Sequence, residues 1–238
     1  VSLVLNTFKA EGLSSEVLLA GSGISAADLS RADTRITTNQ EMLVCANAVA
    51  LRHDIGLELG RRMHVSSYGM LGYALLTSAT LGDALRLALH YPALLGTLFG
   101  LSLEEEDERI WLTAGDYREN PALAPFNVEF CLVSMKVTCE DLLGHPLPLL
   151  GARFEYPAPD YQARYTERFD CPLQFDAASN AFAFYKAWLE YPLPLADAIT
   201  HQAMAERCRK QNTEFTGRQV WLGRIRQLLS AQLNASFI

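Results

Sequence analysis

The 238-residue sequence has no long hydrophobic run and no recognisable leader. Its longest apolar stretches, such as Met70–Ala79, are too short and too closely flanked by polar residues to cross a bilayer. No charged segment followed by an apolar segment and a small-residue cleavage site opens the chain. The first residue is Val1 rather than Met. We therefore expect a soluble, cytoplasmic protein, and a fragment that lacks part of its native N-terminus.

Cysteine is scarce, and its spacing carries no redox or metal motif. The five cysteines form no C-x-x-C pair, and most of them stand among apolar neighbours. An odd number without such a pair argues against a disulfide framework. We expect buried free thiols in a reducing compartment at Cys45, Cys131, Cys139, Cys171 and Cys208.

The motifs of common catalytic and nucleotide-binding sites are also missing. No P-loop, G-x-G-x-x-G, H-E-x-x-H or G-x-S-x-G occurs. The nearest approach, GSGISA at 21–26, has no predicted βαβ unit around it and is better interpreted as a loop before a helix. The five histidines never stand four residues from one another or from a cysteine, so zinc is not expected. We predict that the chain is not an enzyme and carries no metal or other cofactor.

The charges are few and unevenly placed. Half of the residues are hydrophobic and a fifth are charged, which is typical of a globular protein with a sizeable core. The net charge of −7 argues against general affinity for nucleic acid. The segment 206–226, however, holds six Lys or Arg and two Glu, a local +4 that leaves −11 for the rest. This asymmetry suggests a polyanionic partner at the C-terminal end, although basic residues also favour helix C-termini.

The first part of the chain has the period of helices. Helices are predicted over Asn39–Arg52, Gly56–Gly60, Ser66–Thr77 and Leu81–Leu95. Thr80 is the expected N-cap of the last of these, with Asp83 in the capping-box position. Gly69 and Gly72 stand inside a predicted helix, where glycine costs about 1 kcal/mol relative to alanine. We therefore expect another backbone or a ligand to approach closely there.

The middle of the chain changes to the two-residue period of strands. Alternating apolar residues at 99–103 and 110–114 flank the acidic run EEEDER, which predicts a β-hairpin with a solvated tip. A long helix, Phe126–Leu143, follows Pro125 and ends at Gly144. Further predictions are short strands at Gly151–Pro157, Cys171–Phe175 and Ala181–Phe184, and helices at Asp160–Phe169 and Ala196–Gln211.

This order of elements predicts an α+β fold. A helix-rich N-terminal part would precede a small, mainly antiparallel sheet with a long helix, and a helical linker would follow. We divide the chain into a regulatory domain at 1–193, a linker at 194–214 and a closing segment at 215–238. Asn212–Glu214 would end the linker, and Phe215–Leu233 would form a helix whose apolar stripe needs a partner.

The best candidate for a binding site lies at 61–91. Polar side chains stand there within otherwise apolar helices, the mixture that small-molecule sites use. The arginines are possible partners for an acidic or amphipathic metabolite, whereas the tyrosines could instead pack with their hydroxyls at the surface and His90 could end a helix. The candidate ligand-binding residues are Arg61, Arg62, Tyr68, Tyr73, Arg86 and His90.

Two separate segments resemble a known family. The first holds GLELG at 56–60, GMLGYA at 69–74, TLGDAL at 80–85 and the pair His90-Tyr91. The second, at 152–184, ends a strand in P-x-P and continues with Tyr165, Phe169, Pro172, Phe175, Asn180 and Phe184. Both are similar, in the same order, to the N-terminal arabinose-binding-like regulatory domain of AraC-type bacterial transcriptional regulators.

The resemblance implies a domain that binds a small-molecule effector of unknown identity, forms a homodimer and controls a C-terminal helix-turn-helix domain. Phe215–Leu233 resembles the first helix of that DNA-binding domain, the rest of which is missing. Operator DNA would be reached through the missing part, and Arg218 and Arg224 would contact phosphates at most. Ala196–Gln211 and Phe126–Leu143 are both candidates for the dimer interface. The alternative function is a protein–protein interaction module without a small ligand.

Overall fold

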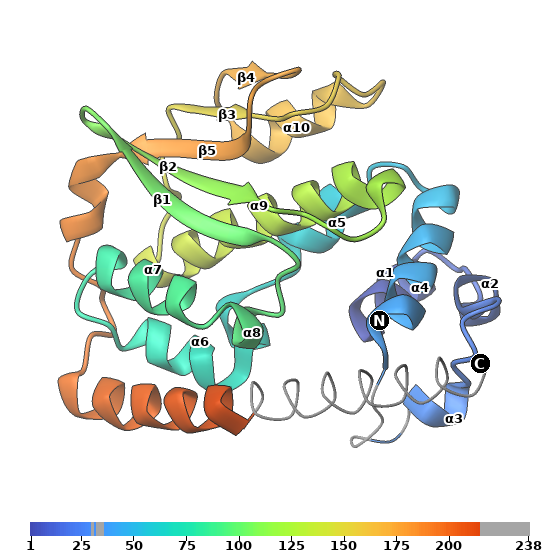
Figure 1. Ribbon diagram of the computed structural model, residues 1–238, viewed down its shortest axis with the longest axis horizontal. Coiled ribbons are helices and arrows are strands. Elements are labelled where there is room, and N and C mark those ends of the chain that lie inside the picture. Colours follow the sequence, from blue (N-terminus) through green and yellow to red (C-terminus); the bar gives the residue numbers. More distant parts are fainter. Residues whose placement is uncertain (30, 32–35, 215–238) are drawn as a thin grey trace, which may run out of the picture.

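A computed structural model of the chain describes residues 1–29, 31 and 36–214 (Figure 1). The predicted closing helix Phe215–Leu233, with Arg218 and Arg224, lies outside these residues. In the described part, the apolar side chains form two clusters. The smaller cluster holds the N-terminal helices together, and the larger one lies between the sheet and the central helix.

The N-terminal helices form one end of the molecule in Figure 1. Thr37 and Gln40 form a reciprocal capping box at the start of α4, which confirms the helix predicted at Asn39–Arg52. Phe8, Leu18 and Val44 are fully buried and join these helices into the smaller cluster. The elements are α1 (Ser2–Ala10), α2 (Ser15–Leu19), α3 (Ala26–Leu29), α4 (Thr38–Leu51) and α5 (Ile55–Arg61).

The next helices differ from the prediction at two points. The helix expected at Ser66–Thr77 is split into η1 (Val65–Tyr68) and α6 (Gly69–Leu76), because Gly69 adopts a φ of +54°. The helix expected at Leu81–Leu95 is split into α7 (Leu81–His90) and α8 (Pro92–Leu95), since proline lacks the N–H that would continue the first helix. The N-cap is confirmed, because Thr80 Oγ1 accepts the Asp83 N–H at 3.1 Å.

Gly72 shows the close approach that its place in a helix predicted. A Cβ added there would lie 2.0 Å from the Val65 carbonyl oxygen. Only glycine therefore lets α6 pack directly on the backbone of η1. The contact joins these two elements into one unit.

Five strands form one sheet in the described residues, in the order β1-β2-β5-β3-β4. All pairings are antiparallel except β3–β4, which confirms the α+β class and the mainly antiparallel sheet. The hairpin is confirmed, but Glu104–Glu106 continue the first strand and the turn lies at Asp107, with a φ of +52°. The strands are β1 (Gly100–Glu106), β2 (Arg109–Gly115), β3 (Gly151–Arg153), β4 (Leu173–Gln174) and β5 (Asn180–Tyr185).

The central helix α9 (Ala124–Leu143) follows a short turn, η2 (Pro121–Leu123), and confirms the predicted long helix. It ends at Gly144, which has a φ of +76°. The stretch Pro121–Leu143 is long and apolar enough to cross a membrane, but 67% of its most apolar window is buried in this fold, as for a core helix. On one side α9 crosses α5 at Gly56 and Gly60, where an added Cβ would lie 2.6 Å and 3.0 Å from backbone carbonyl oxygens of α9.

The last described elements are α10 (Gln162–Phe169), η3 (Lys186–Glu190) and a helix at 198–214. Asn212–Glu214 are helical rather than a break, because no Gly or Pro interrupts the turn, and Thr213 Oγ1 donates to the Arg209 carbonyl at 2.9 Å. Helix 198–214 runs along α6 in Figure 1. It is docked there by His201 Nδ1, 3.0 Å from the Ala74 carbonyl oxygen, and by the buried Cys208.

The cysteine prediction is confirmed. All five cysteines lie in the described residues as free thiols, and four of them are buried. Burial raises the pKa of Cys45 and Cys131 to about 12, so both are uncharged thiols at neutral pH.

Candidate functional site

A cavity of about 300 Å³ lies between the two hydrophobic clusters. One wall comes from α1 and α4, through residues such as Val4 and Met42. The opposite wall is the segment from the end of α8 into β1, including Phe99 and Leu101. The floor is α9, with Phe126, Phe130 and Met135. Because its walls belong to both clusters, this cavity is the place where a bound molecule would contact both at once.

The polar groups of the cavity are few and mostly uncharged. Ser134 Oγ donates to the Cys131 carbonyl at 2.9 Å, and Thr97 Oγ1 lies 3.8 Å from Cys131 Sγ. Asn127 Nδ2 donates to the Tyr117 hydroxyl and to the Leu123 carbonyl, both at 2.9 Å. These side chains therefore already have partners in the protein, and a ligand would have only their remaining hydrogen-bonding positions.

Tyr68 is the one predicted binding residue that lines this cavity. It comes from η1, and its pKa is raised because burial disfavours the charged phenolate. The hydroxyls of Ser134 and Thr138 on α9 act in the opposite direction as hydrogen-bond partners. Tyr68 thus brings an uncharged, orientable hydroxyl to an apolar wall.

Glu41 is the one charged side chain among the described lining residues. It is half-exposed in the first turn of α4 and therefore lies at the mouth. The α-amino group of Val1 lies 3.6 Å from its Oε1. The two charges offset each other, so the mouth offers no net charge to a ligand.

The structure places Arg61 and Arg62 around a carboxylate instead of in the cavity. Arg61 Nη2 and Arg62 Nε each lie 2.8 Å from Glu58 Oε1. Arg168 Nη2, from α10, lies 3.2 Å from Glu58 Oε2. The local sequence could not show that a residue 110 positions away shares this carboxylate. A role for Arg61 or Arg62 in ligand binding stays a prediction.

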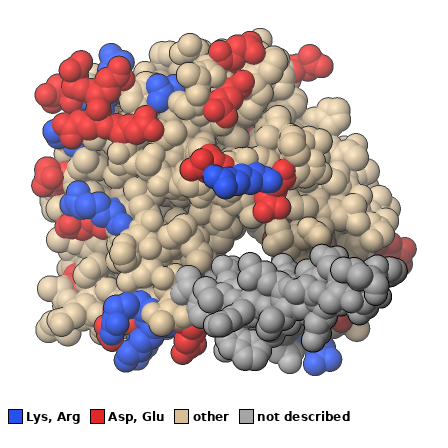
Figure 2. All heavy atoms as spheres, in the orientation of Figure 1, with Lys and Arg blue, Asp and Glu red and all other residues tan. Residues whose placement is uncertain are grey.

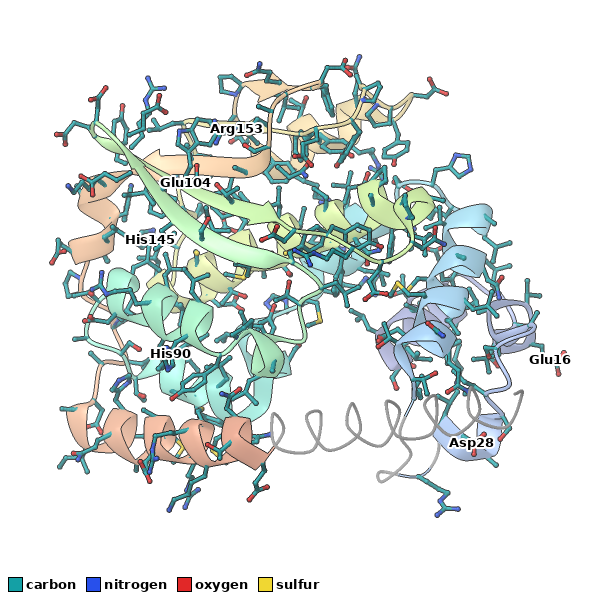
Figure 3. The ribbon with its side chains drawn as sticks, in the orientation of Figure 1. Glu16, Asp28, His90, Glu104, His145 and Arg153 are labelled. Carbon is teal, nitrogen blue, oxygen red and sulfur yellow. The ribbon has the colours of Figure 1, made fainter. Side chains whose placement is uncertain are left out.

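Arg86 and His90 lie together in a more open groove of about 620 Å³, between α7 and helix 198–214. Figure 3 labels His90 at the end of α7. Asp197 and His201 of the linker line the same groove, and Arg86 Nη2 lies 2.9 Å from Asp83 Oδ1. Tyr73, with 63% of its surface exposed, lies in neither place. The six predicted residues are therefore divided among four surroundings.

The acidic run of the hairpin lies at the surface, as its composition predicted. Figure 2 shows Asp and Glu gathered at the upper left, over the tip of β1 and β2. Glu105 pairs with Lys186, and Glu104 lies 3.7 Å from Arg153, both of which Figure 3 labels. The Arg153 guanidinium also stacks 4.1 Å from the centre of the Trp111 ring. These charges partly neutralise one another and surround no cavity.

A buried carboxylate on α9 was not singled out in the sequence. Glu129 is fully buried, and burial raises its pKa to about 7, although hydrogen bonds from Tyr165 and Tyr161 oppose this shift. Both hydroxyls donate to Oε1, at 2.5 Å and 2.8 Å, while Oε2 has no hydrogen-bond partner among the described residues. The available signal was a single Glu in the apolar run NVEFCLV.

The fold and the cavity together define the class of this domain. The family described as the arabinose-binding domain of AraC transcription regulators, N-terminal, matches residues 12–193. Because this match covers most of the chain, the chain belongs to that family. The resemblance found in the sequence is thereby confirmed, and the family consists of transcriptional regulators rather than enzymes.

Individual relatives agree with this assignment. The ornithine utilization regulator of Pseudomonas aeruginosa is 32% identical over 192 residues, which are 81% of this chain and 57% of that protein. Uncharacterized HTH-type transcriptional regulators of Mycobacterium bovis and Mycobacterium tuberculosis are each 23% identical over 221 residues, 83% of this chain and 59% of theirs. The chain thus spans a little over half the length of the curated relatives it matches.

A solved structure shows the same fold. The crystal structure of the transcriptional regulator CdpR from Pseudomonas aeruginosa superposes with a TM-score of 0.59 at 21% identity. The match covers 89% of this chain and 64% of that one. At this identity the likeness is one of fold alone.

Proposed function

We propose that the chain senses a small-molecule effector for a transcriptional regulator, and that the effector binds in the cavity between the two clusters. The observation that carries this proposal is the position of the cavity, because its walls come from both clusters. A ligand favours whichever arrangement it binds better. A molecule that fills this space would therefore favour one relative position of the N-terminal helices and the sheet.

A physical connection from the cavity to the linker supports the proposal. Tyr68 of η1 lines the cavity, and η1 packs on α6 through the Gly72 contact. Helix 198–214 is docked on α6, where the Asp197 N–H donates to the Thr77 carbonyl at 3.1 Å. A shift of Tyr68 would thus be passed through α6 to the linker helix. The divisions proposed here are a sensing domain at 1–193, a linker at 194–214 and the start of a DNA-binding domain at 215–238.

Dimerisation and DNA binding complete the proposal. Of the two interface candidates, helix 198–214 is better suited, since Ile199 has 83% of its surface exposed, whereas α9 is largely buried. Leu195, with 61% exposed, extends this apolar surface. A homodimer would suit paired DNA half-sites. Operator DNA would be contacted by a C-terminal helix-turn-helix domain in the cytoplasm, with Arg218 and Arg224 contributing phosphate contacts.

Light scattering on the 238-residue chain tests the proposal, with and without a metabolite fraction from cells. We expect a dimer whose thermal midpoint rises by a few degrees with the active fraction, since a ligand at 100 times its Kd adds about 2.7 kcal/mol. Ile199→Glu should give a monomer. Gln202→Glu, which adds the same charge at an exposed position of the same helix, should not.

A second candidate function is a protein–protein interaction module without a small ligand. The exposed apolar side chains Tyr73, Leu195 and Ile199 favour it. A monomer whose mass and thermal midpoint are unchanged by every fraction would exclude the sensing dimer and favour this module.

A further inference from the structure

We infer that the cavity selects an uncharged, largely apolar molecule with one or two hydrogen-bonding groups, and that it excludes sugars, carboxylates and free amino acids. The inference rests on the proposed function, because it names the ligand class of the same site. It also separates this chain from what the name of its family and the name of its ornithine-related relative suggest.

The walls of the cavity are made mainly of leucine, phenylalanine and sulfur-containing side chains. Met42, Met63 and Met135 line it, together with the thiols of Cys45 and Cys131. Methionine is flexible and polarizable, so it adapts to apolar ligands of irregular shape and makes favourable contacts with aromatic rings. Such a surface gains by excluding water from an apolar ligand.

The polar groups of the cavity are too few, and too fully engaged, for a sugar. Ser134 Oγ, Asn127 Nδ2 and Thr97 Oγ1 already meet partners in the protein. The Tyr68 hydroxyl adds one further position. A pentose would lose the water bonded to several hydroxyls and regain few of these hydrogen bonds, which weakens binding. One or two polar groups on a ligand can be satisfied here.

Charge excludes acids and amines. No Lys, Arg or His stands among the described lining residues, and the charge of Glu41 is matched by the Val1 amino group. Arg61 and Arg62 are held by Glu58. A ligand carboxylate or ammonium would therefore enter an apolar space without a counter-ion, which is strongly unfavourable.

The size of the cavity sets the scale of a suitable probe. A volume of 300 Å³ is that of about ten water molecules in the liquid, so a probe of about ten non-hydrogen atoms fits. 1-Octanol, octanoate and octylammonium share this size and one apolar chain, and they differ only in the charge of the head.

Isothermal titration calorimetry on the 238-residue chain at pH 7.5 tests the inference with these three probes, L-arabinose and L-ornithine. We expect 1-octanol to bind at least tenfold more tightly than octanoate or octylammonium, and the sugar and the amino acid not to bind detectably. The ranking in the unmodified chain decides the ligand class without any variant. Leu101→Trp, which enlarges a lining residue, should abolish 1-octanol binding. Leu103→Trp is the matched control, because Leu103 lies two residues along β1 and does not line the cavity.

The outcomes separate this inference from the proposed function. Octanoate, octylammonium, arabinose or ornithine binding as tightly as 1-octanol, and blocked by Leu101→Trp, would overturn the ligand class and keep the cavity as the effector site. Failure of every probe to bind would overturn both the inference and the proposed site. Binding of 1-octanol that Leu101→Trp leaves unchanged would place the probe elsewhere and would also overturn the inference.

Discussion

Two buried carboxylates lie on the helices that cross at the centre of the molecule. Glu58 belongs to α5 and is 6% exposed, while Glu129 belongs to α9 and is fully buried. Glu58 faces three guanidinium groups, from Arg61, Arg62 and Arg168. Glu129 meets two tyrosine hydroxyls and no cation among its hydrogen-bond partners in the described residues.

The difference shows that the partner, rather than burial, decides the charge of a buried carboxylate. Burial raises the pKa of Glu58, but hydrogen bonds from Arg61 and Arg62 outweigh it, and the pKa falls below its usual value. Burial also raises the pKa of Glu129, and the hydroxyls of Tyr165 and Tyr161 leave it at about 7. At neutral pH, Glu58 is fully ionised, whereas Glu129 titrates.

The largest expected effect comes from separating the two helices that bring these carboxylates together. Gly56→Ala would place a Cβ 2.5 Å from Glu129 Oε2 and 2.6 Å from the Phe126 carbonyl oxygen. Because backbone cannot move aside cheaply, we expect the free energy of unfolding to fall by about 3 kcal/mol or more. Urea denaturation at pH 7 measures it.

Gly115→Ala is the matched control, since an added Cβ at Gly115 meets no atom within 4 Å. We expect a change within about 0.5 kcal/mol there, as for most surface substitutions. Equal losses at Gly56 and Gly115 would contradict the close crossing of α5 and α9.

The next largest effect is a pH dependence that belongs to Glu129. Its folded pKa lies above the unfolded value, so its protonated form favours folding and the benefit is lost as pH rises through about 7. Ionisation of Glu129 should cost up to about 3 kcal/mol at pH 8 relative to pH 4.5. Glu129→Gln should remove this part of the pH dependence and stabilise the chain at pH 8.

Urea denaturation of both proteins between pH 4.5 and 8 checks the sign. The curves should differ little near pH 5 and diverge above pH 6, with Glu129→Gln the more stable protein. Parallel curves would show that Glu129 keeps its ordinary pKa. A control at the surface is Glu167→Gln, whose exposed ion pair with Arg164 should leave the pH profile unchanged.

Local signals made much of the fold predictable from the sequence. Thr80 as an N-cap, Gly144 as the end of α9 and the alternation at 99–114 each depend on residues within a few positions of one another. The splitting of two helices at Gly69 and Pro92 was missed, because either residue can also be tolerated at a helix start.

The candidate site was less predictable, because it is built from distant parts of the chain. Val4, Met42, Phe99 and Met135 meet only in the folded cavity, and of the predicted residues it includes Tyr68 alone. The arginines were proposed as anion partners because the sequence around Arg61 shows no sign of Arg168 sharing Glu58. Sequence therefore indicated the right segment for polar binding residues but not which of them face the same space.

The smallest of the three effects concerns Glu58 and sharpens the comparison. Glu58→Gln would leave Arg61, Arg62 and Arg168 without their shared carboxylate. These guanidiniums are partly exposed and stay hydrated, so we expect a loss of about 2 kcal/mol at pH 7, below that of a fully buried pair.

The pH dependence of this loss has the opposite sign to that of Glu129. The pKa of Glu58 is lowered in the folded chain, so its contribution is present above the unfolded value, near 4.5, and is lost as pH falls through the folded value. The difference between Glu58→Gln and the unmodified chain in urea should therefore be full at pH 6 and shrink toward pH 3. A loss that stays constant over this range would mean that Glu58 acts through packing rather than through its charge, and the contrast with Glu129 would fail.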